Sequence, residues 1–469
     1  MTAFKAYDIR GLSPGEIDSA FAERLGSAIA SKFLPARVMI GRDMRLTSPE
    51  LEMALINGFV SRGVDVVKIG LCSTPMFNVL LGLNAECATP FDLGVMVTAS
   101  HNPGQYNGFK MTRGNCLPVG HGSGMEELEE AFAESKVVPP AERDPAKGGK
   151  SRKSKVVAHG NVTDDPSALD RYVTHILSLA KLPREMPKMK IAIDAGNGMA
   201  GAVLPELLKR LPWLEVVPLY FELDGSFPNH EANPLKRATL VDLQHVVREH
   251  GCAMGVAFDG DADRVGFVDE IGEAIPGDLL TAFFAQEILR DRPDGLVLYD
   301  VRSSWAVPEA VTEAGGHSDM CPVGHAKIKR LMREKSASFG GELSMHFYFS
   351  DLWNCESGDF AMLVMLRRLV REGKTLAELW KPLARFAKSE EINFEVEDPV
   401  ATIEALERRY APESSKIIRM DGVRIEFGDW WFSIRTSNTE PLVRLNVEAK
   451  SKEMLTTHVE ELRHHIHSV

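Results

Sequence analysis

The stretch LGVMVTASHNPGQYNGFK, residues 93–110, indicates the kind of fold to expect from the whole chain. Residues 93–97 have the composition of a buried strand, and the polar segment that follows ends at Pro103 and Gly104, which stop regular structure. Ser100 should therefore stand on a loop at a strand end, where open α/β sheets carry their chemistry. Taken alone, these residues could equally form a purely structural turn.

His101 follows Ser100 directly and suggests a Ser/His pair, because a serine hydroxyl is a weak nucleophile until something activates it. Neighbouring side chains of an extended segment point to opposite faces. We therefore expect His101 to face away from Ser100, and to shape or protonate the site rather than activate the serine.

One plan of strand, turn and helix occurs three times along the chain. Its strand-like segments lead into helices at residues 38–48, 190–201 and 296–305. Each is followed by a later strand that ends in a polar loop, at residues 95–103, 255–264 and 338–346. This repetition predicts three related α/β domains. One large doubly wound sheet is the alternative, although single cores rarely grow that large.

The length of 469 residues also points to about three or four domains, and 44% hydrophobic with 26% charged residues is ordinary for a globular protein. Polar stretches at 134–168 and 388–400 are expected to be joints, and the basic run at 147–155 a solvated loop. The tail combines strand-like segments with a terminal helix, which predicts a small α+β domain.

The net charge of -12 argues against broad contact with nucleic acid or an anionic membrane. The N-terminus lacks the apolar core of a signal peptide, and no apolar run approaches about 18 residues. We expect a cytoplasmic protein. Its six cysteines form no C-x-x-C pair and are predicted to be reduced and structural.

A second polar constellation is DGDADR, residues 259–264. Three carboxylates at alternate positions of an extended segment face one way, and that much like charge requires a cation, for which Mg²⁺ is suited. An EF-hand fits less well, because its sixth position would be Arg264 rather than glycine. Spacing alone leaves open a phosphoaspartate at Asp259, as in haloacid-dehalogenase-type phosphotransferases, and a merely structural acidic turn.

GNGMAG, residues 196–201, is a literal G-x-G-x-x-G after a strand and is the best indication of a nucleotide-binding oxidoreductase. We give it little weight, because such a turn often serves close packing alone. The strand also ends in Asp194, whose charge would face the pyrophosphate of a dinucleotide.

Two further loops suit a sugar phosphate. Glu342, Ser344 and His346 alternate along a segment expected to be extended, so that they would converge on vicinal sugar hydroxyls. Arg435 precedes hydroxyl and amide side chains in a turn, a combination that can clamp a phosphate. Each loop alone could be a surface hairpin, but together they fit one ligand.

The motifs TASHNP, DGDADR, GELSMH and RTSNTEP, at residues 98–103, 259–264, 341–346 and 435–441, occur in the order found in the α-D-phosphohexomutase family. The chain resembles this family over essentially its whole length. FKAYDIRG at 4–11 and VRLNVE at 443–448 are most similar to its bacterial phosphomannomutase and phosphoglucomutase members.

The resemblance implies three tandem mixed α/β domains and a smaller C-terminal α+β domain around a central active-site cleft. The implied domains carry the phosphoserine, the metal, the sugar-recognition loop and the phosphate clamp, at residues 1–160, 161–272, 273–388 and 389–469. Met345 departs from the glycine common in the family's sugar loop, which leaves the sugar preference open.

The resemblance also implies site residues. Ser100 would be the phosphoserine and, with Asp259, Asp261 and Asp263, a ligand of Mg²⁺. Further catalytic residues would be Arg10, His101, Lys110, Arg264 and His346. Substrate would be bound by Tyr7, Arg302, His325, Glu342, Ser344, His346, Arg435, Ser437, Asn438 and Thr439. Lys110 and His346 are both candidates for the general acid/base.

The implied reaction interconverts mannose 6-phosphate and mannose 1-phosphate, with glucose phosphates as further substrates. It would proceed through a hexose 1,6-bisphosphate intermediate that reorients, and the bisphosphate would also serve as activator. Hexose phosphates would be the small-molecule partners of a monomer or weak homodimer, without nucleic acid or membrane. A non-catalytic sugar-phosphate binder remains an alternative.

Overall fold

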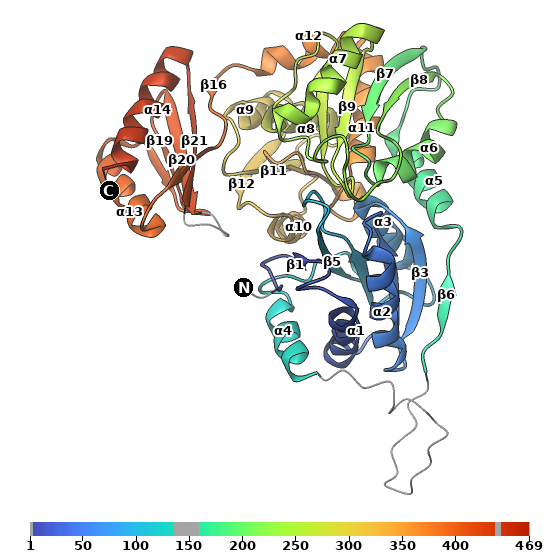
Figure 1. The fold of residues 1–469 in the computed structure, drawn as a ribbon. Coiled ribbons are helices and arrows are strands. Elements are labelled where there is room, and N and C mark those ends of the chain that lie inside the picture. The colour runs from blue at the N-terminus through green and yellow to red at the C-terminus, as the bar shows by residue number, and fades with distance from the viewer. Residues whose placement is uncertain (1–2, 136–158, 437–441, 469) are drawn as a thin grey trace, which may run out of the picture. The chain divides into compact units, whose positions relative to one another are not determined.

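The computed structural model describes residues 3–135, 159–436 and 442–468. The chain forms two compact units, the first made of residues 1–274 and 348–371 and the second of residues 275–347 and 372–469. Figure 1 labels their helices and strands.

The first sheet of unit 1 is mixed, with the strand order β1-β5-β4-β2-β3-β6. Its strands are β1 Ile9–Leu12, β2 Arg37–Arg42, β3 Asp65–Leu71, β4 Leu93–Val97, β5 Tyr106–Arg113 and β6 Val162–Asp164. The helices of this part are α1 Ser19–Phe33, α2 Ser48–Val60, α3 Thr74–Asn84 and α4 Met125–Glu134. Strand β4 is parallel to β2 but antiparallel to β5. The polar loop after β4 therefore reverses the chain direction at the carboxyl end of β4.

The second sheet of unit 1 has the order β10-β9-β7-β8. Its strands are β7 Met189–Asp194, β8 Leu214–Leu219, β9 Met254–Phe258 and β10 Val265–Asp269, with helices α5 Ala168–Ala180, α6 Ala200–Lys209, α7 Val241–His250 and the short 3₁₀ helix Arg237–Leu240. Strands β9 and β10 form an antiparallel hairpin in which Phe258 pairs with Val265. The acidic motif of residues 259–264 is the turn of this hairpin.

In unit 2, β11 (Leu296–Asp300) lies between β12 (His317–Cys321) and β13 (Phe339–Gly341), and all three strands are parallel. The helices of this part are α8 Gly277–Asp291, α9 Ala306–Glu313 and α10 His325–Glu334. Residues 348–371, which return to unit 1, contain nearly all of the elements that follow. Strands β14 (Phe347–Phe349) and β15 (Cys355–Glu356) pair there through Tyr348 and Phe349, next to the 3₁₀ helix Ser350–Leu352 and helix α11 Gly358–Glu372.

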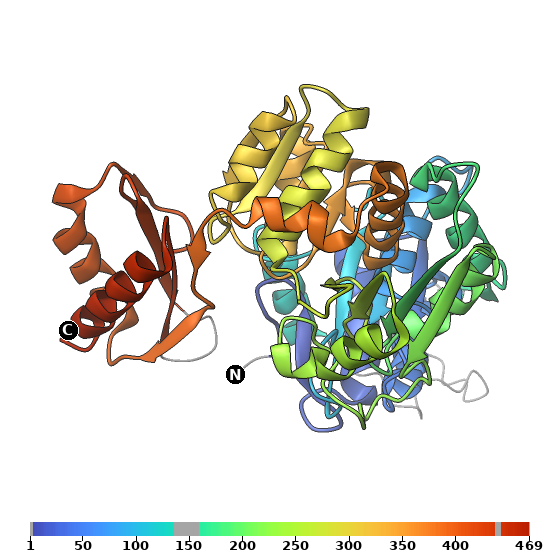
Figure 2. The same cartoon turned by 90° about the horizontal axis from the view of Figure 1, so that it is seen from above.

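The C-terminal part of unit 2 is an antiparallel sheet with the order β16-β21-β20-β19-β18, and β17 also pairs with β21. The strands are β16 Ala387–Lys388, β17 Ile392–Glu395, β18 Lys416–Ile418, β19 Val423–Glu426, β20 Trp430–Thr436 and β21 Leu442–Ala449. Helices α13 Pro399–Tyr410 and α14 Lys452–Ile466 cover one face of this sheet (Figures 1 and 2). Helix α12 Leu376–Trp380 and the 3₁₀ helices Lys381–Leu383 and Ala411–Glu413 complete the unit.

The prediction of three mixed α/β domains followed by a smaller α+β domain is confirmed. The alternative of one large doubly wound sheet is wrong, because the described strands form four separate sheets. Separate clusters of buried hydrophobic residues belong to the first, second and C-terminal sheets, and the C-terminal cluster contains Trp430, Phe432 and Ile434.

A buried arginine holds the loop that carries Ser100 in place. Arg45, between β2 and α2, donates through Nη1 to the carbonyl oxygens of Pro103 and Tyr106 at 2.9 and 2.8 Å. Its Nη2 donates to the carbonyl oxygens of Ser100 and Asn102 at 2.7 and 2.5 Å. One guanidinium therefore serves four main-chain acceptors, which its planar fork of donors makes possible.

Asp43 completes this clamp. Its carboxylate lies 3.2 Å from Nε of Arg45, and it accepts a hydrogen bond from the hydroxyl of Ser48 at 2.5 Å. Burial raises the pKa of Asp43 against the opposing effect of Arg45. The buried charge of Arg45 is thus paired, so that the clamp can stay in the interior.

We predict that Arg45→Lys lowers the free energy of unfolding of unit 1 by about 2–4 kcal/mol, because an ammonium cannot serve all four buried carbonyls. Urea denaturation followed by tryptophan fluorescence, together with limited proteolysis at residues 98–106, would measure the effect. Arg42→Lys, at the partly exposed ion pair with Glu52, is the matched control. An Arg45→Lys protein as stable and as protease-resistant as the control would contradict the clamp.

Candidate active site

Two loops of unit 1 bring Ser100 to the acidic motif. The hydroxyl of Ser100 lies 3.2 Å from Oδ2 of Asp259 and donates to it. A Cβ atom on Gly260 would lie 2.5 Å from the Ser100 carbonyl oxygen, so only glycine allows the two loops to approach this closely. Two segments that are about 160 positions apart in sequence thus share one site.

His101 does not face away from Ser100, as we expected from the sequence. Its Nδ1 lies 3.2 Å from the Ser100 hydroxyl oxygen. The expectation was wrong because it assumed an extended backbone, whereas Ser100 has a φ of 53°, in the left-handed region. The alternation of side chains does not hold there, and both side chains point to the same side.

The three aspartates of the acidic motif converge. One carboxylate oxygen from each of Asp259, Asp261 and Asp263 lies within 4.8 Å of the others, and all three residues are buried. They converge through a turn in which Ala262 has a φ of 61°, not through the extended segment that we assumed. Burial and the two neighbouring carboxylates raise the pKa of Asp259 well above its usual value.

Lys110, on β5, offsets part of this charge. Its Nζ lies 2.6 Å from Oδ2 of Asp261 and 2.6 Å from Oδ2 of Asp263. Burial opposes the charge on Lys110, but the attraction of the two carboxylates outweighs it and raises the pKa of the ammonium. The hydroxyl of Thr74 also donates to Oδ2 of Asp261 at 2.6 Å.

The remaining oxygen of Asp261, Oδ1, is buried and has no hydrogen-bond partner among the described residues. Buried carboxylate oxygens normally have a partner. Three converging aspartates, one oxygen without a donor and the nearby Ser100 hydroxyl together fit a hard divalent cation with oxygen ligands.

Two arginines flank the serine loop. Arg10 donates through Nη1 to Oδ1 of Asn102 at 2.6 Å and to the carbonyl oxygen of Ala99 at 3.2 Å, and Asp8 pairs with Arg10 at 2.7 Å. Arg264 donates its main-chain N–H to Asp259 at 3.1 Å, and its Nε lies 3.9 Å from the same carboxylate.

The predicted residue Tyr7 lies half-buried on the segment that leads into β1.

The glycine-rich turn at residues 196–201 packs against the acidic motif. A Cβ atom on Gly198 would lie 2.8 Å from the carbonyl oxygen of Gly260, which also accepts the N–H of Met199 at 2.9 Å. The Asp194 carboxylate accepts the N–H of Gly196 at 2.8 Å and contacts His230 at 2.9 Å. These contacts give the motif a packing role in the structure.

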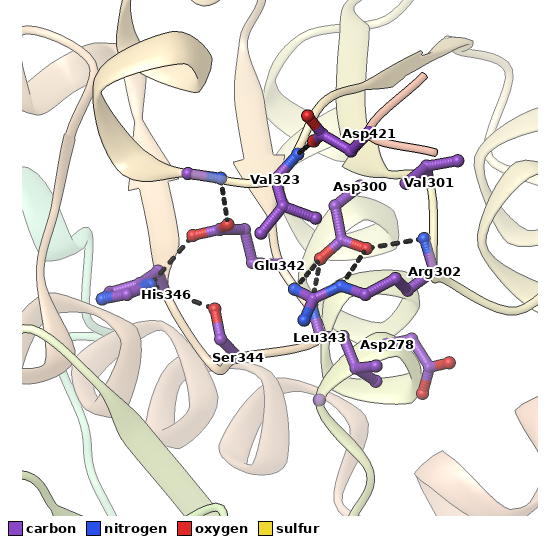
Figure 3. Close-up of polar contacts among 12 residues, drawn as sticks. Asp278, Asp300, Val301, Arg302, Val323, Glu342, Leu343, Ser344, His346 and Asp421 are labelled. Carbon is purple, nitrogen blue, oxygen red and sulfur yellow. Dashed lines mark hydrogen bonds and ion pairs between the residues drawn. The ribbon is translucent and has the colours of Figure 1, made fainter. Parts of the chain in front are cut away.

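Unit 2 brings together the predicted sugar-loop residues (Figure 3). Nδ1 of His346 lies 2.9 Å from Oε2 of Glu342 and 3.2 Å from the Ser344 hydroxyl. The other oxygen of Glu342 accepts the N–H of Gly324 at 3.0 Å, next to His325 at the start of α10. As in the acidic motif, the residues meet through a turn, in which Met345 has a φ of 66°.

Asp300, at the end of β11, organises the same region. It accepts the main-chain N–H of Arg302 at 2.8 Å, and it pairs with the Arg302 guanidinium at 2.7 Å. Its Oδ2 also accepts the N–H of Leu343 at 2.8 Å, so one carboxylate positions both an arginine and the sugar loop (Figure 3).

Arg435 lies on β20 and pairs with Glu391 at 3.0 Å, while Nη1 of Arg302 lies 3.8 Å from the same carboxylate oxygen. Ser437, Asn438, Thr439 and the basic run at 147–155 lie outside the described residues. No sequence motif had indicated four further residues of these sites: Arg45, Thr74, Asp300 and Glu391. Of these four, only Asp300 could have been recognised in the sequence, because it ends a predicted strand in the same way as Asp194.

Comparison with protein-family models gives four matches in chain order. They are phosphoglucomutase/phosphomannomutase alpha/beta/alpha domain I at residues 1–137, domain II at 170–272, domain III at 276–386 and the C-terminal domain at 391–465. Among the described residues, each helix is too short or too polar to span a membrane.

Similar proteins cover almost the whole chain. A protein of Xanthomonas campestris pv. campestris (strain B100) named "Phosphohexose mutases" is 37% identical over 464 residues, 98% of both chains. The phosphomannomutase of Escherichia coli (strain K12) is 37% identical over 455 residues, 96% of this chain and 95% of its own.

The crystal structure of a phosphoglucomutase/phosphomannomutase family protein from Burkholderia thailandensis has a TM-score of 0.84 and 31% identity, covering 100% of this chain and 97% of its own. The resemblance seen in the motifs is thereby confirmed. The chain belongs to the phosphoglucomutase/phosphomannomutase family and is a phosphate-transferring isomerase.

Proposed function

We propose that this enzyme interconverts mannose 6-phosphate and mannose 1-phosphate, and likewise the two glucose phosphates, through a phosphorylated Ser100. The observation that carries the proposal is the 3.2 Å contact between the Ser100 hydroxyl and Asp259, within a cluster of three buried carboxylates. The names of the Escherichia coli and Xanthomonas campestris relatives support this choice of reaction.

Asp259, Asp261, Asp263 and the oxygen on Ser100 would hold Mg²⁺. Bound there, Mg²⁺ would offset the charge of the phosphoryl group during transfer. The N-acetylphosphoglucosamine mutase of Aspergillus fumigatus, which is 14% identical and has a TM-score of 0.60, has been solved with GlcNAc-6P and magnesium.

In the forward transfer, the bond between phosphorus and Oγ of Ser100 breaks while a sugar hydroxyl oxygen forms a new bond to phosphorus. Arg10, Lys110 and Arg264 would supply positive charge around the moving phosphoryl group, which carries about -1.5 to -2 charges on serine. The hydroxyl proton needs an acceptor. Of the two candidates, Lys110 is held as an ammonium by Asp261 and Asp263 and would have to lose its proton first, whereas His346 can accept one as a neutral imidazole. Nδ1 of His101, 3.2 Å from the Ser100 hydroxyl oxygen, would lie beside the phosphoryl group carried there.

Unit 2 would bind the rest of the substrate. Hydrogen bonds to the sugar hydroxyls would come from Glu342, Ser344 and His346. The ring would be oriented by Arg302 and His325, and by Tyr7, which belongs to unit 1. The non-reacting phosphate would bind to Arg435 and the segment Ser437, Asn438 and Thr439. The bisphosphate intermediate must then reorient, so that its original phosphate can return to Ser100.

The same assignment divides the roles among four domains. Residues 1–160 would carry the phosphoserine, 161–272 the metal, 273–388 the sugar loop and 389–469 the phosphate clamp. If the protein contacts hydroxyls 3 and 4 of the sugar, mannose and glucose phosphates can share the site, because they differ at position 2.

We predict that Ser100→Ala lowers kcat for mannose 1-phosphate by at least about 10⁴-fold, because the phosphate store is lost. Intact-mass analysis and peptide mapping of fresh wild-type protein should place one phosphoryl group on Ser100. Ser178→Ala, at an exposed position of α5, is the matched control. A phosphate on Asp259 instead, with release of inorganic phosphate, would favour the phosphoaspartate alternative.

Removal of divalent cations with EDTA should abolish turnover, and Mg²⁺ should restore it. Asp261→Asn should weaken Mg²⁺ binding by about 10²-fold, because it replaces a charged oxygen ligand and leaves the amide beside Lys110. Thermal shift with Mg²⁺ measures binding independently of activity. Asp242→Asn, at an exposed position of α7, is the control, and unchanged Mg²⁺ binding by Asp261→Asn would contradict the metal assignment.

Glu342→Gln should lower kcat/KM for mannose 1-phosphate and glucose 1-phosphate alike, by about 10²-fold, because a charged acceptor for the sugar hydroxyls is lost. Both substrates and an amino-sugar phosphate should be assayed side by side. The wild-type values for mannose and glucose phosphates are expected within about tenfold of each other. A selective loss for one sugar would contradict a shared contact through hydroxyls 3 and 4.

A further inference from the structure

Two arginines of the C-terminal sheet lie directly opposite each other. Arg435 on β20 pairs in register with Arg444 on β21. Like charges at directly opposite positions destabilise an antiparallel ladder. The two side chains are only 13% and 31% exposed, so water screens their repulsion incompletely. An anion between the two guanidinium groups would relieve this repulsion.

Glu391 supplies one negative charge at this position. Its Oε2 accepts a hydrogen bond from Nη2 of Arg435 at 3.0 Å, and its Oε1 accepts one from Nη1 of Arg444 at 3.2 Å. Nη1 of Arg302 lies 3.8 Å from Oε2. Burial raises the pKa of Glu391, but the attraction of Arg435 and Arg302 outweighs this effect and lowers it. Glu391 therefore remains an anion at neutral pH.

The cluster of Arg302, Arg435, Arg444 and Glu391 is not balanced in charge. Asp300 pairs with Arg302, and the Glu342 carboxylate also acts on Arg302, whereas Arg435 and Arg444 share the one carboxylate of Glu391 in the ion pairs of the described residues. The Nε atoms of Arg435 and Arg444 are also buried without a hydrogen-bond partner in the described part of the chain. The cluster thus keeps both a positive charge and two donors for which Glu391 provides no acceptor.

We propose that Arg435 and Arg444 together form a phosphate site, and that Glu391 is a built-in counter-anion that a ligand phosphate displaces. The inference rests on the proposed function, in which a hexose phosphate is the ligand, and it adds Arg444 and Glu391 to the role proposed for Arg435. A carboxylate and a phosphate both present paired oxygens to guanidinium groups, but the phosphate carries more charge and a third acceptor oxygen.

This exchange suits a reaction in which the phosphate must not bind too tightly. The bisphosphate has to leave the clamp and rebind in the opposite orientation before the cycle closes. Binding energy that is equal in the ground state and the transition state lowers KM without raising kcat. A resident carboxylate that competes for the same guanidinium groups weakens the ground-state grip and speeds release.

The test uses the full chain and inorganic phosphate as the probe, measured by isothermal titration calorimetry at low ionic strength. Glu391→Gln should bind phosphate about five- to tenfold more tightly than the wild type, because the competing charge is gone. Arg444→Gln should bind it about tenfold more weakly. Glu390→Gln removes the same charge one residue away, at an exposed position, and should leave the affinity unchanged.

The double variant separates this site from any other phosphate site on the protein. If Glu391 acts on Arg444, most of the gain from Glu391→Gln should vanish in the Arg444→Gln background, because the two changes are coupled. Equal gains in both backgrounds would overturn the proposal. An equal gain in Glu390→Gln would also overturn it, because the effect would then be one of net charge.

Thermal unfolding keeps the test valid if Glu391→Gln is unstable. Loss of the counter-anion should lower the unfolding midpoint in phosphate-free buffer, and added phosphate should restore it more strongly than it stabilises the wild type. A midpoint that stays low in phosphate would show a merely structural role and overturn the proposal.

Turnover gives a separate readout. In Glu391→Gln, KM for mannose 1-phosphate should fall and kcat should fall with it, whereas a folding defect would lower kcat alone. If the enzyme instead proves inactive on hexose phosphates while the phosphate affinities change as expected, the proposed function fails and the anion exchange stands.

Discussion

The mutual repulsion of three buried carboxylates is the constraint on which the site of unit 1 depends. Asp259, Asp261 and Asp263 approach within 4.8 Å inside a turn from which water is largely excluded. Such a cluster persists only if positive charge surrounds it, because a buried charge without a partner is strongly destabilising. Lys110 supplies one charge from β5, and the position of that strand beside β4 brings the serine loop to the same place.

The three polar loops that follow strands in the repeated α/β plan also share a backbone conformation. A non-glycine residue in the left-handed region lies in each of them: Ser100 at 53°, Ala262 at 61° and Met345 at 66°. Such residues cost free energy and persist where the surrounding structure fixes them. Here they turn each loop back sharply, so that side chains close in sequence point to one side. At Ser100, the four carbonyl contacts from Arg45 hold the loop in this form.

The sequence was sufficient to predict the fold class and which residues come together in each loop. Strand-like segments that end in polar loops indicated the repeated α/β plan, and the motifs indicated the family. The reasoning failed where it assumed extended backbone, as for His101, because left-handed residues other than glycine leave little trace in composition. Arg45 and Glu391 were missed for another reason. Their partners are main-chain carbonyls or arginines far along the chain, and a pattern of local residues does not specify such contacts.

The aspartate cluster of unit 1 and the arginine cluster of unit 2 are built in the same way, with the signs of the charges reversed. In unit 1, Lys110 bridges two of the three carboxylates at 2.6 Å each, and one oxygen of Asp261 has no partner among the residues that the structure describes. In unit 2, Glu391 bridges two guanidinium groups at 3.0 and 3.2 Å, and their two Nε donors have no acceptor in the described part of the chain. Each centre is folded around a partial counter-ion and therefore does not need its ligand in order to form. Each is also left short of neutrality, so that a cation completes the first and an anion the second. A fully neutralised centre would gain little from a ligand, and a centre without any counter-ion would be hard to fold and slow to release what it binds. The proposed reaction, in which a phosphate group is released and bound again in every cycle, would need this partial neutralisation.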